Sequence, residues 1–192
     1  MDIRQFFFKY RSYIPIPIAI LIIYFASEQK PYYLLGLLML LFGESIRIWA
    51  VSYAGGKTRT RKVGAPALCT SGPYAFTRNP LYLGNMFMYI GITLVAGAPN
   101  IIFMILIIFS FFMIQYTLIV SLEEETLTNL FGEAYINYKK NVPPIFPRIT
   151  PWKNKAETTR TPILKTLKTE KRTLQNVFLI LALIFLKSQN IL

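Results

Sequence analysis

Residues 100–122 read NIIFMILIIFSFFMIQYTLIVSL, a run that contains no charged side chain. A helix crosses the roughly 30 Å hydrocarbon core of a bilayer with about 20 apolar residues. The run is long enough for this, and it predicts a membrane-spanning helix. Only Ala98 and Pro99 separate it from the apolar run at 81–97. We therefore expect the two runs to form a tight antiparallel hairpin.

Three more apolar runs, at about residues 13–27, 32–51 and 173–191, bring the number of predicted spans to five. The whole chain, residues 1–192, is then expected to be a single all-α integral membrane domain with five transmembrane helices. Its composition agrees, because 54% of the residues are hydrophobic and 16% are charged, more apolar than a compact water-soluble core needs. These proportions exclude a soluble globular enzyme.

The residue counts also exclude several kinds of chemistry. The chain contains no histidine, so histidine-based triads and histidine metal sites are ruled out. The single cysteine, Cys69, excludes an internal disulfide framework and a cluster of thiolates. We therefore expect no metal.

The basic residues predict the orientation of the chain in the membrane. Eighteen of the twenty-one Lys and Arg residues fall in the N-terminal segment or in the loops at 52–80 and 123–172. Short loops rich in Lys and Arg face the cytoplasm. The N-terminus and both loops are thus expected in the cytoplasm, with the C-terminus on the opposite side. The chain has a net charge of +12. We expect its basic residues to contact anionic lipid headgroups and not nucleic acid, because the sequence has no nucleic-acid-binding motif.

The two cytoplasmic loops are the expected place for chemistry. The first is too rich in turn formers for a regular helix before Pro80, which suits the first turn of the third span. Asn79 precedes it and has two interpretations: a helix cap or a binding residue. Of the consecutive residues Glu123, Glu124 and Glu125, at least one must be a solvated surface charge, because successive helical residues point about 100° apart.

Two further side-chain patterns each leave alternatives open. Phe131, Tyr135 and Tyr138 follow helical spacing, which predicts a helix that either packs on an apolar surface or contributes to a site. Within the second span, Glu44 and Arg47 are three residues apart and share a helix face. They form either a structural ion pair or a site in which Arg47 holds an anionic group.

Three sequence blocks occur in a recognisable order and spacing. They are GESIRIWA at 43–50, SGPYAFTRNPLYLG at 71–84 and EEETLTNLFGEAYINYKKNVP at 123–143. Together they resemble the isoprenylcysteine carboxyl methyltransferase family over about residues 36–147, and especially its small archaeal and bacterial members.

The resemblance implies an integral membrane enzyme that takes S-adenosylmethionine from the cytoplasm and a lipid-linked or prenylated acceptor from the bilayer, and that releases S-adenosylhomocysteine. It also implies a cytoplasmic cofactor-binding region. By position, the cofactor-binding residues would be Pro66, Ala67, Leu68, Cys69, Tyr74, Asn79, Pro80, Leu81, Tyr82 and Glu123. Arg47 or Arg78 would orient the acceptor carboxylate as the catalytic residues.

Two positions depart from the family pattern. The family usually has histidine where this chain has Asn79, so any role that requires an imidazole is lost. Ile119 stands where eukaryotic members have an arginine that contacts substrate. Similar motifs also occur in phospholipid N-methyltransferases and membrane sterol reductases, so the motifs alone do not identify the substrate.

Three functions remain under consideration. The first is methylation of the carboxylate of an isoprenylcysteine-like lipid, which needs no general base because the acceptor is ionised at neutral pH. The second is a phospholipid or other lipid N-methyltransferase, which fits less well because an ammonium must first lose a proton. The third is a non-enzymatic membrane scaffold.

Overall fold

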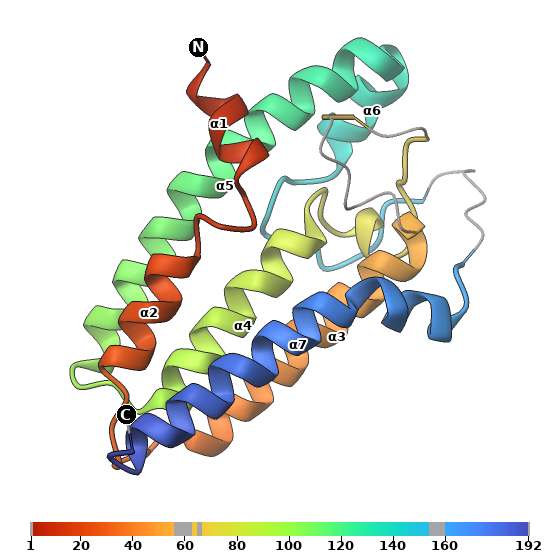
Figure 1. Ribbon diagram of the computed structural model, residues 1–192. Coiled ribbons are helices and arrows are strands. Elements are labelled where there is room, and N and C mark those ends of the chain that lie inside the picture. Colours follow the sequence, from red (N-terminus) through yellow and green to blue (C-terminus); the bar gives the residue numbers. More distant parts are fainter. Residues whose placement is uncertain (1, 56–62, 65–66, 154–159, 192) are drawn as a thin grey trace.

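The computed structural model describes residues 2–55, 63–64, 67–153 and 160–191. In this part of the chain it has helices and turns but no strand, which confirms the predicted all-α class. The helices are α1 (Ile3–Lys9), α2 (Ile16–Tyr24), α3 (Tyr33–Ala54), α4 (Pro80–Ala96), α5 (Ile101–Phe131), α6 (Glu133–Asn141) and α7 (Ile163–Ser188), with a 3₁₀ turn η2 (Gly72–Ala75). They form an elongated bundle with the N- and C-termini at opposite ends (Figure 1).

The backbones of α3 and α4 come into close contact because glycine faces glycine at two levels. A Cβ atom added to Gly36 would lie 2.7 Å from the carbonyl oxygen of Gly91, and one added to Gly43 would lie 2.6 Å from that of Gly84. Small residues allow helices in a membrane to pack this closely. The contact also fixes Arg47, whose Cγ would lie 2.6 Å from a Cβ at Gly84.

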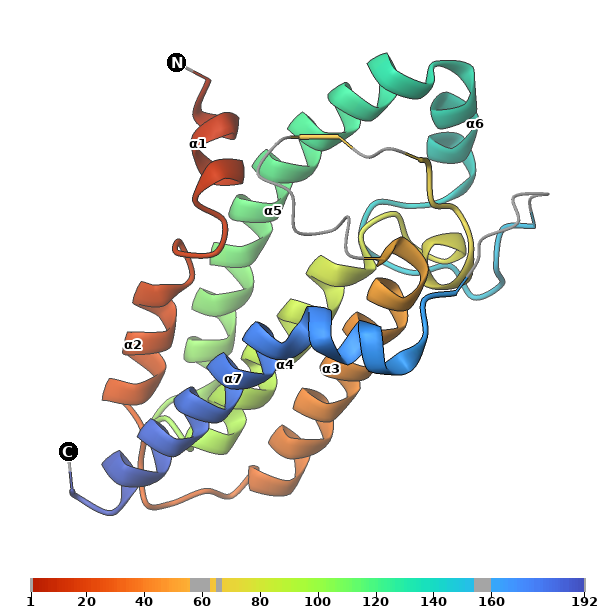
Figure 2. The same cartoon turned by 45° about the vertical axis from the view of Figure 1, so that its right-hand side comes forward.

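The apolar core lies between α4, α5, α2 and α7. Ile92 of α4, Ile108 and Phe112 of α5, Ile22 of α2 and Ile184 of α7 are buried in one cluster. In Figures 1 and 2, α7 runs along α3 and α4, which it contacts. The core thus holds together the helices that carry the polar residues described below.

The predicted spans correspond to helices of very different lengths. Among the described residues, α3 and α5 are long and apolar enough to cross a membrane. The nine residues of α2 rise only about 14 Å, roughly half the bilayer core. Pro15 lies at the start of this helix. It has no N–H to bond to a preceding helical turn and its ring clashes with that turn, so the helix does not extend further toward the N-terminus. The count of five spans stays a prediction.

Two helices extend beyond the limits of the predicted spans. We expected the fourth span to end at residue 122, but α5 continues nine residues further to Phe131, so Glu123 lies within the same helix. We expected the last span to begin at 173, but α7 begins ten residues earlier, at Ile163 directly after Pro162. In both cases charged residues marked the end of the apolar run, and they did not break the helix.

Candidate functional site

A hydrogen bond between α4 and α5 lies at the centre of the candidate site. The hydroxyl of Tyr82, in the first turn of α4, donates to Oε2 of Glu123 at 3.1 Å. The Tyr82 ring also stacks on Tyr116 of α5, with ring centroids 4.4 Å apart. Tyr82 lies in the first turn because Pro80 begins the helix, as predicted. Two of the predicted cofactor-binding residues, Tyr82 and Glu123, are therefore in direct contact.

Asn85 links this pair to Arg47. Its Nδ2 donates to the Tyr116 hydroxyl at 3.0 Å, and its Oδ1 accepts from Nη1 of Arg47 at 2.5 Å. Asn85 lies one residue from the glycine that contacts α3, so its side chain reaches the arginine across the closest point between the two helices. A polar cluster thus extends from Glu123 to Arg47, joined by hydrogen bonds and by the stacking of Tyr82 on Tyr116.

Arg47 binds acidic side chains of the chain itself. Its Nη2 donates to Oε2 of Glu170 on α7 at 2.6 Å and to Oγ1 of Thr173 at 3.2 Å. Glu44 lies on the same face of α3, with its Oε2 3.7 Å from Nε of Arg47. The expected contact between Glu44 and Arg47 is present, but the shorter ion pair is with Glu170, whose side chain is only 1% exposed.

Four residues of this cluster were not predicted from the sequence: Asn85, Tyr116, Glu170 and Thr173. A signal for two of them exists on α7. Thr166, Glu170 and Thr173 follow the spacing i, i+4, i+7, which places three polar side chains on one helix face. A polar face on a helix next to a buried arginine indicates an ion pair. This signal was missed because the helix was predicted to begin only at residue 173.

Arg78 lies in a separate cluster that joins α4, α5 and α6. Its Nε donates to Oε1 of Glu124 at 2.9 Å, and its Nη1 donates to the carbonyl oxygens of Lys139 and Val142. Lys139 also contacts Glu124, at 2.9 Å. The guanidinium of Arg78 thus holds the C-terminal end of α6 against α5. Glu125 is exposed, so it is a surface charge, as expected for at least one of the three consecutive glutamates.

Helix α6 packs against two parts of the loop at 52–80, namely η2 and Leu68. Tyr135 and Tyr138 are buried together and pack against Leu68 and Phe131, in agreement with the packing interpretation. The expectation of a single helix through all three aromatic residues is wrong. Phe131 itself ends α5, because Gly132 interrupts the helix at a φ of +52°. The Tyr138 hydroxyl donates to the carbonyl oxygen of Tyr74 at 2.7 Å. Burial raises the pKa of Tyr138, so its hydroxyl stays protonated and available as a donor.

Asn79 does not cap α4 through its side chain, so this interpretation is wrong. Its Nδ2 instead donates to the carbonyl oxygen of Pro144 at 2.9 Å. The amide therefore ties the start of α4 to the proline-containing segment after α6. A neutral amide is a good donor for this contact at any pH.

The other predicted cofactor-binding residues lie close to these contacts. Leu68 packs beside Tyr138 in the α6 cluster, and Cys69 is half-buried one residue further along the chain. Leu81 is half-buried in the first turn of α4, and Ala67 is exposed. Pro66 lies outside the described residues.

The chemistry of this site suits a ligand with cationic and hydroxyl groups. The Glu123 carboxylate accepts hydrogen bonds, and the tyrosine rings attract a cation through their faces. No group of three metal-ligating side chains occurs among the residues that the structure describes.

The fold and the site define a class of protein: a helical bundle with helices of membrane-spanning length and a partly buried polar cluster between them. The chain belongs to the phospholipid methyltransferase family, whose sequence profile matches residues 31–134. This segment contains Arg47, Tyr82, Asn85 and Glu123. The matched segment includes the polar cluster except for two residues on α7, Glu170 and Thr173.

The sequence is also similar to individual curated proteins. It is 35% identical over 120 residues to protein-S-isoprenylcysteine O-methyltransferase of Rattus norvegicus and 35% identical over 119 residues to that of Homo sapiens; each match covers 59% of this chain and 40% of the relative. Nickel-cobalt-cadmium resistance protein NccN of Alcaligenes xylosoxydans xylosoxydans is 29% identical over 117 residues, 61% of this chain and 49% of that protein. The first two matches confirm the resemblance to isoprenylcysteine carboxyl methyltransferases.

The extent of these matches is limited. The chain spans about 40% of the length of the isoprenylcysteine methyltransferases that it matches. No solved structure gives a significant match.

Proposed function

We propose that this protein is an integral membrane methyltransferase that uses S-adenosylmethionine to methylate the carboxylate of an isoprenylcysteine-like lipid. The observation that carries the proposal is the position of the polar cluster. The connected residues Arg47, Asn85, Tyr82 and Glu123 all fall within the segment that matches the family profile. A carboxylate and an arginine linked across α3, α4 and α5 provide opposite charges for a cationic cofactor and an anionic acceptor.

The residues present fit S-adenosylmethionine. Glu123 would hold its ribose hydroxyls or its ammonium, and Tyr74 and Tyr82 would pack on the adenine or the sulfonium. The backbone from Pro66 to Cys69, together with Asn79, Pro80 and Leu81, would complete the site. When bound, the cofactor supplies an electrophilic methyl group. Tyr82 already donates a hydrogen bond to Glu123 and so fixes the orientation of the carboxylate.

Arg47 is our proposed ligand for the acceptor carboxylate. Its Nη1 is held by Asn85, which fixes the plane of the guanidinium, while Glu170 occupies Nη2. An acceptor carboxylate at this position would share or replace the contact with Glu170. No proton has to be removed from an ionised carboxylate, so alignment and the exclusion of water suffice. Arg78 is the second candidate, although Glu124 and two carbonyl oxygens already engage its guanidinium.

Two features support a membrane location with the proposed orientation. The termini lie at opposite ends of the bundle, and α1 and α6 lie toward the same end (Figure 1). This arrangement agrees with a cytoplasmic N-terminus, both large loops in the cytoplasm, the C-terminus on the other side, and five spans. Cysteines introduced at residues 60 and 155 of a Cys69→Ala chain should then be labelled from the same face. Labelling from opposite faces would contradict this orientation.

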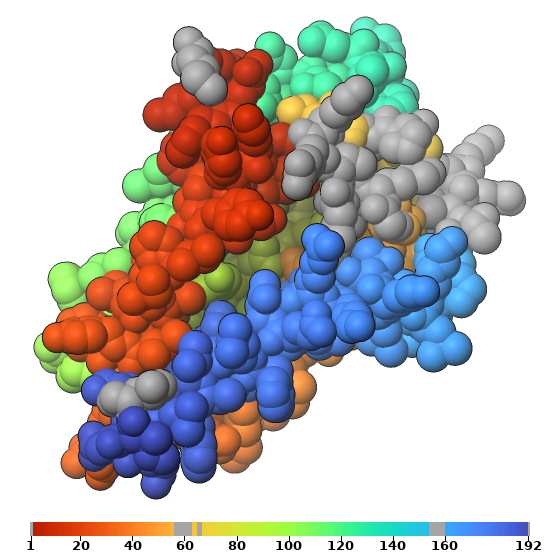
Figure 3. Space-filling model, viewed as in Figure 1, coloured from red at the N-terminus to blue at the C-terminus, as the bar shows by residue number. Residues whose placement is uncertain are grey.

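A hollow on one face of the bundle suits a lipid-linked acceptor. Figure 3 shows it between the N-terminal helices and α7, with α4 at its floor. Because α4 carries Tyr82 and Asn85, an acceptor in this hollow would approach the polar cluster from the side of the bundle.

The description of the matching family favours a second candidate, a methyltransferase that acts on a phospholipid. An amine headgroup is protonated at neutral pH and must lose a proton before it can accept a methyl group. The chain has no histidine to remove it. We therefore rank the carboxylate acceptor first.

Calorimetry tests the cofactor part of the proposal and separates an enzyme from a scaffold. We expect the purified protein to bind S-adenosylmethionine and S-adenosylhomocysteine. Hydrogen bonds to a charged group contribute about 1.5–3 kcal/mol, so Glu123→Ala should weaken binding at least about tenfold. Glu125→Ala, which removes an exposed carboxylate two residues away, is the matched control and should bind normally. No binding by the wild type would support a scaffold, and unchanged affinity in Glu123→Ala would remove this residue from the site.

A further inference from the structure

Helix α7 buries polar side chains on its inner face and exposes large apolar side chains on its outer face. Thr166 and Glu170 are 0% and 1% exposed, and Glu170 is turned inward to Arg47. On the outer face, Leu164 is 80% exposed and Phe178 is 75% exposed. A helix on the surface of a water-soluble protein buries its large apolar side chains instead. The exposed leucine and phenylalanine therefore indicate apolar surroundings for part of the outer face.

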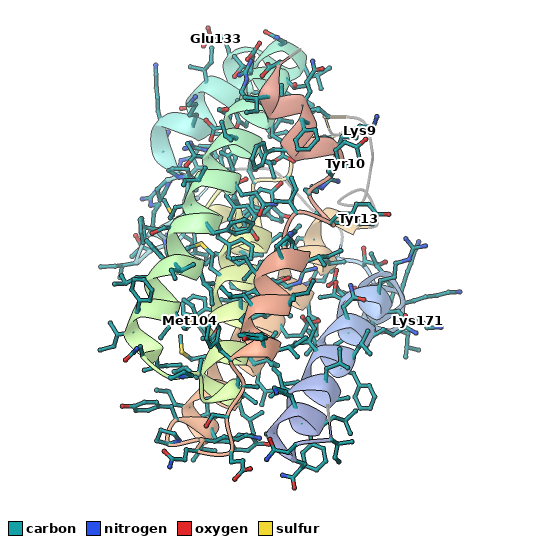
Figure 4. The ribbon with its side chains drawn as sticks, turned by 60° about the vertical axis from the view of Figure 1, so that its left-hand side comes forward. Lys9, Tyr10, Tyr13, Met104, Glu133 and Lys171 are labelled. Atoms are coloured by element: carbon teal, nitrogen blue, oxygen red, sulfur yellow. The ribbon has the colours of Figure 1, made fainter. Side chains whose placement is uncertain are left out.

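The same outer face carries basic residues at regular positions. Lys168 and Lys171 are exposed and three residues apart, and Lys165 and Arg172 flank them. Figure 4 shows the Lys171 side chain pointing away from the bundle. Because the carboxylate of Glu170 faces the interior, it leaves the positive charge of this face in place. Lysines beside exposed apolar residues on one helix are typical of a segment at the level of lipid headgroups.

A hollow on this face brings the two kinds of side chain together. It is shallow and open, and its lining residues all belong to α7: Leu167, Lys168, Lys171, Leu174, Gln175 and Phe178. The lysines lie toward the start of the helix and Phe178 lies toward the apolar second half. A ligand that fits must carry an anionic group followed by an apolar tail.

We propose that this hollow binds an anionic phospholipid, with its phosphate between Lys168 and Lys171 and an acyl chain along Leu174 and Phe178. The charge and the apolar surface of the face both fit this occupant, since clusters of Lys and Arg on amphipathic helices attract anionic lipids. The lipid would hold α7 at the membrane surface. Because Glu170 on the inner face binds Arg47, the lipid would also stabilise the position of α7 against α3. The proposal does not depend on methyl transfer.

The test compares lipids and variants of the full-length chain in a neutral detergent. Native mass spectrometry and thermal unfolding would be measured with phosphatidylglycerol, phosphatidylcholine and inorganic phosphate. We expect retention of phosphatidylglycerol over phosphatidylcholine, and stabilisation by phosphatidylglycerol but not by inorganic phosphate. In Lys168→Gln/Lys171→Gln the apparent dissociation constant for phosphatidylglycerol should rise at least about tenfold. The control Lys140→Gln/Lys153→Gln, which makes the same change of charge at two exposed lysines elsewhere, should bind as the wild type does.

A third variant separates the lipid tail from its headgroup. Phe178→Ala should weaken binding of long-chain phosphatidylglycerol more than binding of a short-chain form, because it removes the contact with the acyl chain. Equal affinity for the two headgroups, equal stabilisation by inorganic phosphate, or unchanged binding in the double lysine variant would overturn the proposal. A change of oligomeric state in that variant with unchanged lipid binding would overturn it too, and would indicate that the face contacts a second copy of the chain.

Discussion

Removal of Glu170 tests whether the buried ion pair between α3 and α7 contributes strongly to the free energy of unfolding. Glu170 and Arg47 are 2.6 Å apart, with side chains 1% and 10% exposed. Loss of one partner of a buried pair costs about 3–5 kcal/mol, because the remaining charge stays buried without its counter-ion. Glu44 is further from Arg47, at 3.7 Å, so it offsets only part of the loss. We therefore expect Glu170→Ala to lose about 3 kcal/mol of unfolding free energy.

The assay is thermal unfolding of the purified protein in detergent. For a chain of this size, 1 kcal/mol corresponds to about 2–4 °C in melting temperature, so Glu170→Ala should melt at least about 6 °C lower. Glu125→Ala is the comparison, because Glu125 contacts Arg4 at a similar distance, 2.7 Å, but is 58% exposed. Its melting temperature should change by less than about 2 °C. If the two variants melted at the same temperature, burial would not explain the stability of the α3–α7 contact.

Three other substitutions test separate parts of the structure. Arg47→Lys should lower the rate of methyl transfer while leaving the calorimetric affinity for the cofactor unchanged, because an ammonium cannot hold both Asn85 and a carboxylate as a guanidinium does. Gly84→Val should cost about 1–3 kcal/mol in thermal unfolding, since its Cβ would lie 2.7 Å from the carbonyl oxygen of Gly43. Tyr138→Phe should cost about 1–2 kcal/mol by leaving the carbonyl of Tyr74 without its donor.

Each of these three predictions would be contradicted by a specific result. Normal turnover and a normal melting temperature in Arg47→Lys would show that Arg47 has a structural role. Arg78 would then be the remaining candidate for binding the acceptor carboxylate. Gly84→Val with an unchanged melting temperature would contradict the close packing of α3 against α4. An unchanged melting temperature in Tyr138→Phe would mean that water replaces the lost hydroxyl.

The sequence predicts the helices of this fold better than it predicts their ends. Long apolar runs identify α3, α4 and α5, because a helix with an apolar surface must be buried in protein or in lipid. Their ends are harder to predict, because helix propensity continues through charged residues such as Glu123 and Lys171. These two helix ends lie instead at residues that interrupt a helix: α5 ends before Gly132, and α7 begins after Pro162.

The site was partly predictable because its family motifs can be recognised in the sequence. Tyr82 and Glu123 were both identified by position, and their hydrogen bond follows from the hairpin of α4 and α5. The partner of Arg47 was not, because Glu170 is 123 residues away, and only the packing of α7 against α3 brings it near. Nor could sequence reveal that Arg78 holds α6, since two of its hydrogen bonds go to backbone carbonyls.

Methyl transfer from labelled S-adenosylmethionine to a panel of acceptors tests the central claim most directly. The panel contains a prenylcysteine acid, its carboxamide analogue, phosphatidylethanolamine and phosphatidylglycerol, each presented to the purified protein in detergent. We predict label in the prenylcysteine acid alone, in a product that releases labelled methanol in base, as a methyl ester does. Base-stable label in phosphatidylethanolamine, with none in the acid, would contradict carboxyl methylation and identify an N-methyltransferase.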